Sequence, residues 1–245
     1  MAIDPRLAER RREVAEDRAR RKVGRLIRLL VVVGLIGGAA WLLLSPILSV
    51  DEVTTSGVEV STTHSVLVAH DVIAGTPMIL IRTGEIESAL ESDPWIREAV
   101  VELDWPGRVS VRVEERDPVA WLSTGEAWGR FAVDGVQLAS APEPDTSLPW
   151  IDLEPETGKD EDARRVLGAL EFAAALPQEL KEGTRVRVES DGELWAEVAG
   201  YQVRLGRAVE MAAKALSLAA LIREQPASGS ILTLLAPTHP AVTPP

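Results

Sequence analysis

Few residues in this chain have the types and spacing that metal binding requires. The sequence holds three histidines and no cysteine, which excludes disulfide bonds, thiol chemistry and cysteine metal sites. His64 and His70 lie six residues apart, with Asp71 beside them. Neighbouring ligands on one helix face are three or four residues apart, and zinc needs several convergent ligands. We therefore expect no metal site and no cofactor.

Paired carboxylates are common, but their placement does not favour acid–base catalysis. Glu114 and Glu115 are adjacent on a predicted strand, where neighbouring side chains point to opposite faces. The run Asp160-Glu161-Asp162 is typical of a solvated acidic surface. A Gly-x-Ser-x-Gly turn and a glycine-rich phosphate-binding loop are both absent from the sequence. We therefore predict that the protein is not an enzyme and has no small-molecule substrate.

The elements that would position any site begin with an apolar run, Leu29–Val50, which contains no charged residue. A bilayer core requires about 20 apolar residues in a helix, so Leu29–Val50 is predicted to span a membrane. Six basic residues lie between positions 18 and 28, and acidic residues follow at once after Val50. Because basic residues remain on the cytoplasmic side, we place the C-terminal part outside the cytoplasm. The run is longer than the apolar segment of a signal peptide, which indicates an uncleaved anchor.

The formal charge is distributed unevenly along the chain. The net charge is −12, yet the arm of residues 1–28 has ten basic and five acidic residues, a net of +5. The remainder has 16 basic and 33 acidic residues, a net of −17. An acidic extracytoplasmic part argues against nucleic acid, because phosphate binding needs a basic surface. Nucleic-acid binding by the arm is one alternative; membrane topology and attraction to anionic lipid headgroups are the simpler interpretation.

The first predicted domain covers residues 53–120 in the order strand, helix, helix, strand, strand. A breaker at Gly75-Thr76-Pro77 precedes the short apolar piece Met78–Ile81, which we expect to be buried. Apolar and polar residues alternate along residues 109–114, which predicts a strand with one buried face. The chain is thus expected to be α+β.

The second predicted domain covers residues 121–236 and is mostly antiparallel strand with two helices. The helices are expected over Ala163–Leu176 and Arg207–Arg223, the second with a Glu210–Lys214 ion pair. The last strand is predicted over Ile231–Leu235, and the proline-rich residues 237–245 are expected to form a flexible tail.

Several short motifs recur in a recognisable order behind the anchor. They are Gly75-Thr76-Pro77-Met78-Ile79, Pro94-Trp95-Ile96, Trp105-Pro106, Glu114-Glu115-Arg116-Asp117-Pro118-Val119-Ala120, Val133-Asp134-Gly135-Val136, Val203-Arg204-Leu205-Gly206 and Ala236-Pro237-Thr238-His239-Pro240-Ala241-Val242. Together they resemble the FtsQ family of bacterial cell division proteins, called DivIB in some lineages. Each motif alone is unspecific, and their order over nearly the whole chain carries the resemblance.

The resemblance implies a single-pass type II membrane protein with its N-terminus in the cytoplasm. It also implies a POTRA domain followed by an FtsQ-type β domain, and a role as a divisome scaffold at the division septum. The implied partners are FtsB-like proteins (DivIC in some lineages) and FtsL-like proteins, bound through extracytoplasmic contacts.

The resemblance further implies where those partners bind. In this family a partner segment adds a strand to an exposed sheet edge in the C-terminal part of the β domain. The matching residues here are Ile231, Leu232, Thr233, Leu234 and Leu235. Thr233 stands where the family often has an acidic residue. An ordinary core strand is the alternative interpretation for each of these side chains.

Two other functions are weighed against the scaffold. A membrane-anchored extracytoplasmic domain that senses a ligand or a wall fragment would need convergent polar residues in a pocket. A POTRA protein of outer-membrane assembly would normally be followed by a barrel, and the single anchor and the acidic extracytoplasmic part disfavour it.

Overall fold

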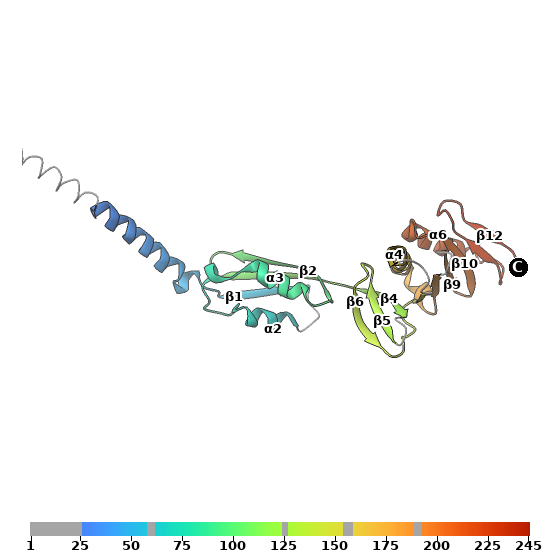
Figure 1. Ribbon diagram of the computed structural model, residues 1–245, viewed down its shortest axis with the longest axis horizontal. Coiled ribbons are helices and arrows are strands. Elements are labelled where there is room, and N and C mark those ends of the chain that lie inside the picture. Colours follow the sequence, from blue (N-terminus) through green and yellow to red (C-terminus); the bar gives the residue numbers. More distant parts are fainter. Residues whose placement is uncertain (1–25, 58–61, 124–126, 154–158, 189–192) are drawn as a thin grey trace, which may run out of the picture. The chain divides into compact units, whose positions relative to one another are not determined.

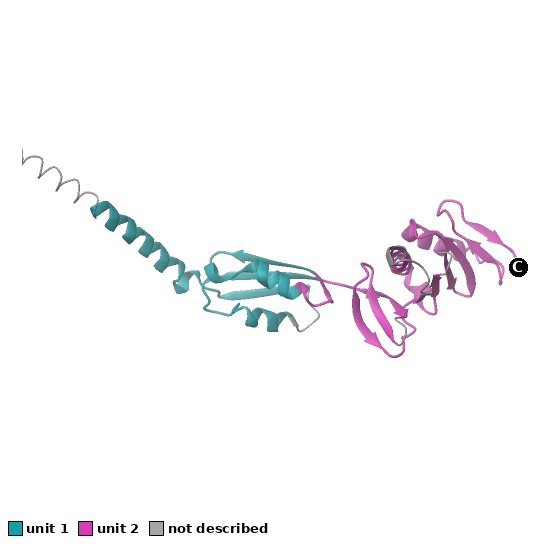
Figure 2. Cartoon of the chain, in the orientation of Figure 1, with its two compact units in different colours: residues 1–90, 98–114 teal, residues 91–97, 115–245 magenta. Residues whose placement is uncertain are grey.

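The computed structural model describes residues 26–57, 62–123, 127–153, 159–188 and 193–245, and Figure 1 shows its elements along the chain. Most of the predicted cytoplasmic arm, residues 1–25, lies outside the described residues. The chain divides into two compact units, which Figure 2 colours separately. Unit 1 comprises Met1–Leu90 and Glu98–Glu114, and unit 2 comprises Glu91–Arg97 and Glu115–Pro245.

The apolar run begins as a helix, Leu26–Leu43, which is long and apolar enough to cross a membrane. The prediction of Leu29–Val50 differs at its C-terminal end: the helix ends at Leu43, seven residues earlier. At the other end the helix already includes Leu26, the first residue that the structure describes. Pro46 lacks an N–H group, so the chain turns there into a 3-10 helix, η1 (Pro46–Leu48). Val50 is 1% exposed and packs in the domain that follows, so it is not part of the span.

Unit 1 contains a three-stranded sheet in the order β1-β3-β2, with β1 parallel to β3. Its elements are β1 (Glu52–Ser56), α2 (Thr62–Ala69), η2 (Met78–Leu80), α3 (Thr83–Glu91), β2 (Ile96–Asp104) and β3 (Arg108–Glu115). Val109, Val111 and Val113 of β3 are all buried, as the alternation predicted. The predicted order of strand, helix, helix, strand, strand is confirmed.

The short apolar piece Met78–Ile81 is only half buried, so this prediction was wrong for two of its residues. Met78 and Ile81 are 0% and 9% exposed, whereas Ile79 and Leu80 are 50% and 62% exposed. The reason is the 3-10 geometry of η2, in which residues three apart share one face. Positions 78 and 81 therefore face the core, and positions 79 and 80 face away from it.

Unit 2 contains a sheet of nine strands, counted over the described residues, in the order β12-β11-β10-β9-β8-β7-β4-β5-β6. The strands are β4 (Pro118–Ser123), β5 (Trp128–Ala132), β6 (Gln137–Ala141), β7 (Trp150–Leu153), β8 (Arg185–Val188), β9 (Leu194–Val198), β10 (Tyr201–Gly206), β11 (Ile231–Thr233) and β12 (Ala241–Thr243). The pairs β10–β11, β7–β8 and β4–β7 are parallel, and the other five pairs are antiparallel. The predicted α+β class with a mostly antiparallel sheet is confirmed. The predicted domain boundary between residues 120 and 121 falls inside β4.

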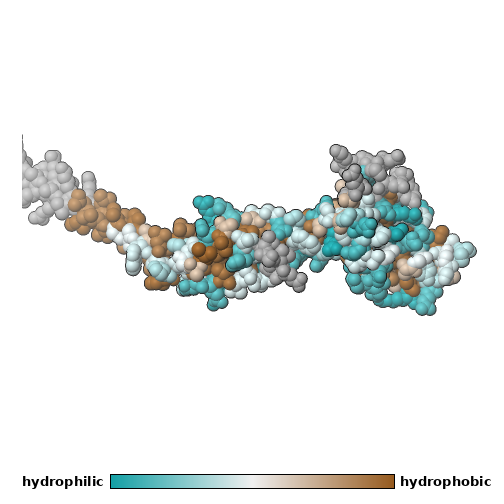
Figure 3. Space-filling view, turned by 90° about the horizontal axis from the view of Figure 1, so that it is seen from below, coloured by the Kyte–Doolittle hydropathy of each residue, from teal (hydrophilic) through white to brown (hydrophobic). Residues whose placement is uncertain are grey.

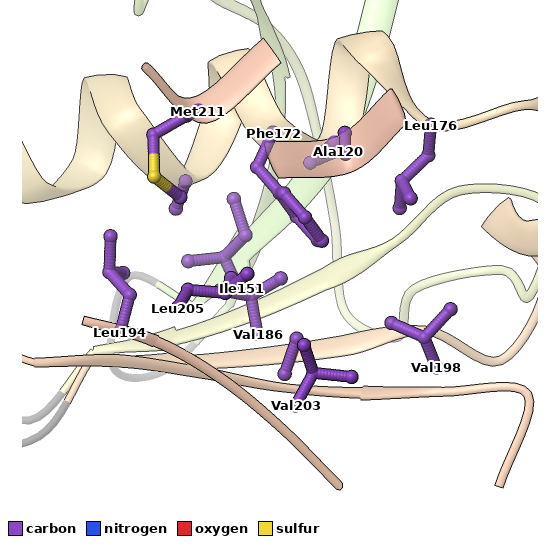
Figure 4. Close-up of a cluster of buried hydrophobic side chains, with 14 of the residues drawn as sticks. Ala120, Ile151, Phe172, Leu176, Val186, Leu194, Val198, Val203, Leu205 and Met211 are labelled. Atoms are coloured by element: carbon purple, nitrogen blue, oxygen red, sulfur yellow. The ribbon is translucent and has the colours of Figure 1, made fainter. Parts of the chain in front are cut away.

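Two helices, α4 (Lys159–Ala175) and α6 (Met211–Arg223), supply one wall of the core of unit 2, and a single turn, α5 (Gln178–Lys181), follows α4. Figure 4 shows the side chains of these helices and of the sheet meeting, with Phe172 and Met211 above Leu205 and Val203. All four of these side chains are 0% exposed. Gly168 lets α4 approach the start of α6: a Cβ there would lie 2.5 Å from the Cβ of Ala208, just before α6, and 3.5 Å from Met211 Cγ.

Candidate partner-binding site

The predicted docking strand lies inside the sheet rather than at its edge. β11 pairs with β10 on one side and with β12 on the other, so both of its edges are occupied. Leu232 and Leu234 are 0% exposed, and the N–H of Leu234 donates to the carbonyl of Arg204 at 2.8 Å. Ile231 and Leu235 are 40% and 54% exposed. The five predicted residues are thus divided between the core and the surface.

The edge next to β11 belongs to β12, in a segment that the sequence analysis assigned to a flexible tail. Ala241, Val242 and Thr243 lie opposite Thr233, Leu232 and Ile231, and all three are exposed. The prediction of a flexible tail over residues 237–245 was therefore wrong for these residues. Three residues between two prolines are too short to show the alternation by which a strand is predicted.

The hairpin between β11 and β12 is also tied to the rest of unit 2. Ser217 Oγ on α6 donates to the carbonyl of Pro237 at 2.8 Å. Leu235 packs over Gly206, where a Cβ would lie 2.6 Å from Leu235 Cδ2. Gly206 also has a φ of +68°, a conformation that favours glycine. The edge strand is thus held by side-chain packing as well as by its ladder to β11.

Lys214 on α6 supports the same end of the sheet from within the core. It is 2% exposed, and its Nζ donates to the carbonyls of Leu205 and Arg207 at 2.7 Å and 2.9 Å. Burial lowers the pKa of Lys214, and the nearby Glu210 carboxylate opposes this effect. Instead of forming the predicted ion pair with Glu210, the ammonium group binds the carbonyl of Leu205 in β10 and that of Arg207 just after the strand. A lysine is difficult to predict here because its helical spacing alone suits a solvated face.

A cross-strand row of arginine and tryptophan lies on the sheet face opposite the core. Arg187, Trp195 and Arg204 are paired in register across β8, β9 and β10, and the row continues through Thr233 to Ala241 on β12. The Arg204 guanidinium lies 5.8 Å from the Trp195 ring centroid. It also donates to both oxygens of Glu193, at 2.8 Å and 2.9 Å. Sequence reasoning missed this row because its members come from separate strands.

Arg116, in the family motif Glu114–Ala120, links segments that are distant in the chain. Its Nε donates to Asp134 Oδ2 at 2.7 Å, and its Nη1 donates to the carbonyls of Pro94 and Ile96. Burial acts to raise the pKa of Asp134, but hydrogen bonds from Arg116 and from the N–H of Val136 outweigh it and lower that pKa. Arg116 thus joins three separate segments of unit 2, which is a structural role.

The candidate metal-binding groups form no site in the part of the chain that the structure describes. Within the described residues, no group of three or more His, Cys, Asp or Glu side chains could hold a metal ion. Of the acidic run Asp160-Glu161-Asp162, the structure describes the side chain of Asp162, which accepts a hydrogen bond from Arg165 at 3.2 Å.

Comparisons with known proteins address the family directly. The family model for the POTRA domain, FtsQ-type, matches residues 48–116. Cell division protein FtsQ of Streptomyces griseus is 32% identical over 215 residues, which cover 84% of this chain and 99% of the relative. Cell division protein FtsQ of Streptomyces coelicolor is 30% identical over 213 residues, 82% of this chain and 81% of the relative. The chain belongs to the FtsQ family of cell division proteins.

A solved structure is also similar to this FtsQ-family chain. The major extracytoplasmic domain of the cell division protein DivIB from Geobacillus stearothermophilus matches with a TM-score of 0.33 and 14% identity. The match covers 46% of this chain and 99% of that domain. As an FtsQ-family member with one apolar N-terminal helix, the chain is a single-pass membrane protein with an extracytoplasmic domain.

Proposed function

We propose that this FtsQ-family chain is a non-catalytic scaffold of the divisome, located at the septum, which binds FtsB-like and FtsL-like proteins. The family membership supports the role in cell division and does not favour a ligand-sensing or wall-sensing domain. The observation that carries the proposal is the strand β12, which is exposed in all three residues and paired on one side only with β11.

The proposed docking surface moves by one strand from the one that the sequence indicated. Unpaired N–H and C=O groups at an edge can pair with an incoming strand, and β12 presents such groups whereas β11 does not. The exposed side chains of Ile231 and Leu235 lie on the neighbouring β11 and its C-terminal extension, where they add apolar contact area to this edge.

The direct test is a pull-down of the full chain in detergent against FtsB-like and FtsL-like proteins of the same organism. Successive N–H groups along a strand point to opposite sides, so Val242→Pro and Thr243→Pro remove N–H groups of opposite direction. One of the two variants should lose partner binding while it keeps its thermal stability. The other removes an N–H from the β11–β12 ladder and should lower the stability.

A matched control separates edge pairing from a general loss of apolar surface. Leu216→Ala changes a side chain on α6 that is 62% exposed and lies outside the sheet, so it should bind normally. If both proline variants are folded and both bind the partners as strongly as the unchanged protein, docking at β12 is refuted. Leu234→Pro is unsuitable for this test, because it removes a wholly buried side chain and the hydrogen bond to Arg204 and is expected to unfold the strand.

A further inference from the structure

The end of unit 1 that follows the transmembrane helix exposes apolar side chains from three separate segments. Ile47 on η1 is 66% exposed, and Ile79 and Leu80 on η2 are 50% and 62% exposed. Trp105, in the turn between β2 and β3, is 46% exposed. We name these four residues the juxtamembrane patch. Figure 3 shows brown, apolar surface on the helix and again on the adjoining end of unit 1.

Hydrogen bonds hold the first two segments side by side. Ser49 and Pro77 form an antiparallel bridge, with η1 ending one residue before Ser49 and η2 beginning one residue after Pro77. The N–H of Val50 donates to the carbonyl of Thr76, and the N–H of Gly75 donates to the carbonyl of Val50, each at 2.8 Å. The two 3-10 turns therefore form one surface.

The tryptophan turn is joined to this surface. The N–H of Gly107 donates to Met78 Sδ at 3.0 Å, which places the turn against η2. The N–H groups of Asp51 and Glu52 both donate to the carbonyl of Gly107, at 2.6 Å and 3.1 Å. Trp105 is two residues from Gly107, so its indole belongs to the same end of the domain. Tryptophan is enriched where proteins meet the membrane–water interface.

Chain length keeps the patch near the bilayer. The apolar helix ends at Leu43, and the basic residues lie at the opposite end of the run, so Leu43 lies near the outer boundary of the bilayer core. Leu44 and Ser45 still donate to Ala40 and Leu42, so the chain does not extend there. At about 2 Å per residue in 3-10 geometry, Ile47 lies about 8 Å beyond Leu43, which is within the headgroup layer.

We propose that the juxtamembrane patch inserts into the interfacial layer of the lipid bilayer, so that the first extracytoplasmic domain rests on the membrane that anchors it. The occupant of the patch is lipid because the patch is apolar, continuous with the span and equipped with an interfacial tryptophan. The arginines at this end are ion-paired: Arg82 with Glu85 at 2.7 Å, and Arg108 with Glu52 at 3.1 Å. Contact with the bilayer is therefore apolar and does not depend on anionic lipid.

The test uses single cysteines in the full chain, which has no cysteine of its own. Leu80→Cys reports on the patch, Leu35→Cys on the span, and Leu216→Cys is a matched control because Leu216 is also 62% exposed. Each variant is spin-labelled and reconstituted in nanodiscs of zwitterionic phosphatidylcholine. Collision rates with oxygen, which is enriched in lipid, and with a water-soluble nickel chelate are then measured.

Insertion predicts that the label at position 80 is shielded from the nickel chelate several-fold more than the label at position 216. Its oxygen collision rate should approach that at position 35, and 1 M salt should leave both rates unchanged, since salt screens charge and not apolar burial. A label at position 80 that is as open to nickel as that at position 216 would overturn the proposal. Shielding that needs high anionic lipid content, or that arises only when other division proteins are added, would also overturn it.

Discussion

The two ends of the nine-stranded sheet protect their edge strands in different ways. At one end, β6 includes the buried Leu138 and pairs with β5 through a bulge between Arg130 and Phe131. A bulge twists an edge away from regular pairing, which makes it a poor template for another strand. At the other end, β12 is regular but only three residues long, between Pro240 and Pro244.

This difference supports β12, and not β6, as the proposed partner-binding edge. The β6 end is held by side chains: Arg130 stacks 4.7 Å from the Trp121 ring centroid and binds Asp145 at 2.9 Å. The β12 end is also held by side chains, but its edge is limited by brevity and flanking prolines, which restrict how far a strand can pair and leave its backbone groups accessible. A short regular edge therefore favours a short, specific pairing over open-ended aggregation.

The largest expected effect comes from comparing a buried residue of β11 with the exposed residue opposite it on β12. Leu232 and Val242 lie opposite one another in the ladder, yet they are 0% and 42% exposed. Leu232→Ala should lower the free energy of unfolding by about 2–5 kcal/mol because it leaves a cavity in the core. Val242→Ala should change it by less than about 0.5 kcal/mol. Thermal or denaturant unfolding in detergent measures both, and similar losses would contradict the placement of β12 at the surface.

The next largest effect concerns the packing of the β6 end. A Cβ on Gly129 would overlap Phe131 Cε2 and lie 3.1 Å from the Gln137 side chain. Gly129→Val should therefore lower the free energy of unfolding by about 1–3 kcal/mol through overpacking. Gly84→Ala is the control, because nothing lies within 4 Å of the added Cβ and the site is helical. Gly84→Ala should leave the free energy of unfolding unchanged or raise it slightly. If Gly129→Val lowers it no more than Gly84→Ala does, the β6 end is not tightly packed.

Alkaline pH should increase the stability that Lys214 contributes at the β12 end of the sheet. The pKa of Lys214 is lowered by burial, so between the folded and the unfolded pKa the unfolded state binds more protons at this residue than the folded state. Stability contributed at this site should therefore increase as the pH rises through the folded pKa toward 10.5. Lys214→Met should lack that increase while it loses the two hydrogen bonds to carbonyls. Parallel pH profiles of the two proteins in thermal unfolding would contradict this assignment.

Acidic pH should decrease, by a smaller amount, the stability that Asp134 contributes at the β6 end of the sheet. The pKa of Asp134 in the β5–β6 turn is lowered in the folded state, so its carboxylate stabilises the fold above its unfolded pKa. That contribution is lost as the pH falls through the folded pKa. The pair with Arg116 is partly exposed, so Asp134→Asn should lower stability at pH 7 by less than about 1 kcal/mol. The difference should disappear in strong acid; a constant difference at all pH values would contradict an electrostatic origin.

Much of the architecture could be predicted from local patterns. The apolar run predicted the span, and the alternation along residues 109–114 predicted which face of β3 is buried. The order of elements in the first domain also followed from the sequence, because turn residues and helical or strand periodicity act over a few residues. The end of the span at Leu43 did not follow, since residues 44–50 carry no charge and continue the apolar run.

The proposed partner-binding edge could be predicted only in part, because the neighbours of a strand in a sheet come from residues far apart in the chain. The sequence pointed to the C-terminal end of the sheet, but it assigned the edge to Ile231–Leu235, and the structure places β12 outside them. The burial of Lys214 and the exposure of Leu80 were likewise not apparent from residue type.

The sequence by itself determined the anchor, the α+β class, the order of elements and the family, because periodicity, charge and motif order are properties of consecutive residues. Only the tertiary structure decided which strand is the edge, which carbonyls Lys214 binds, and which apolar side chains of the 3-10 turns remain outside. Alternation along a strand specifies its buried face, whereas its neighbours in the sheet are specified by pairing between residues far apart in the chain.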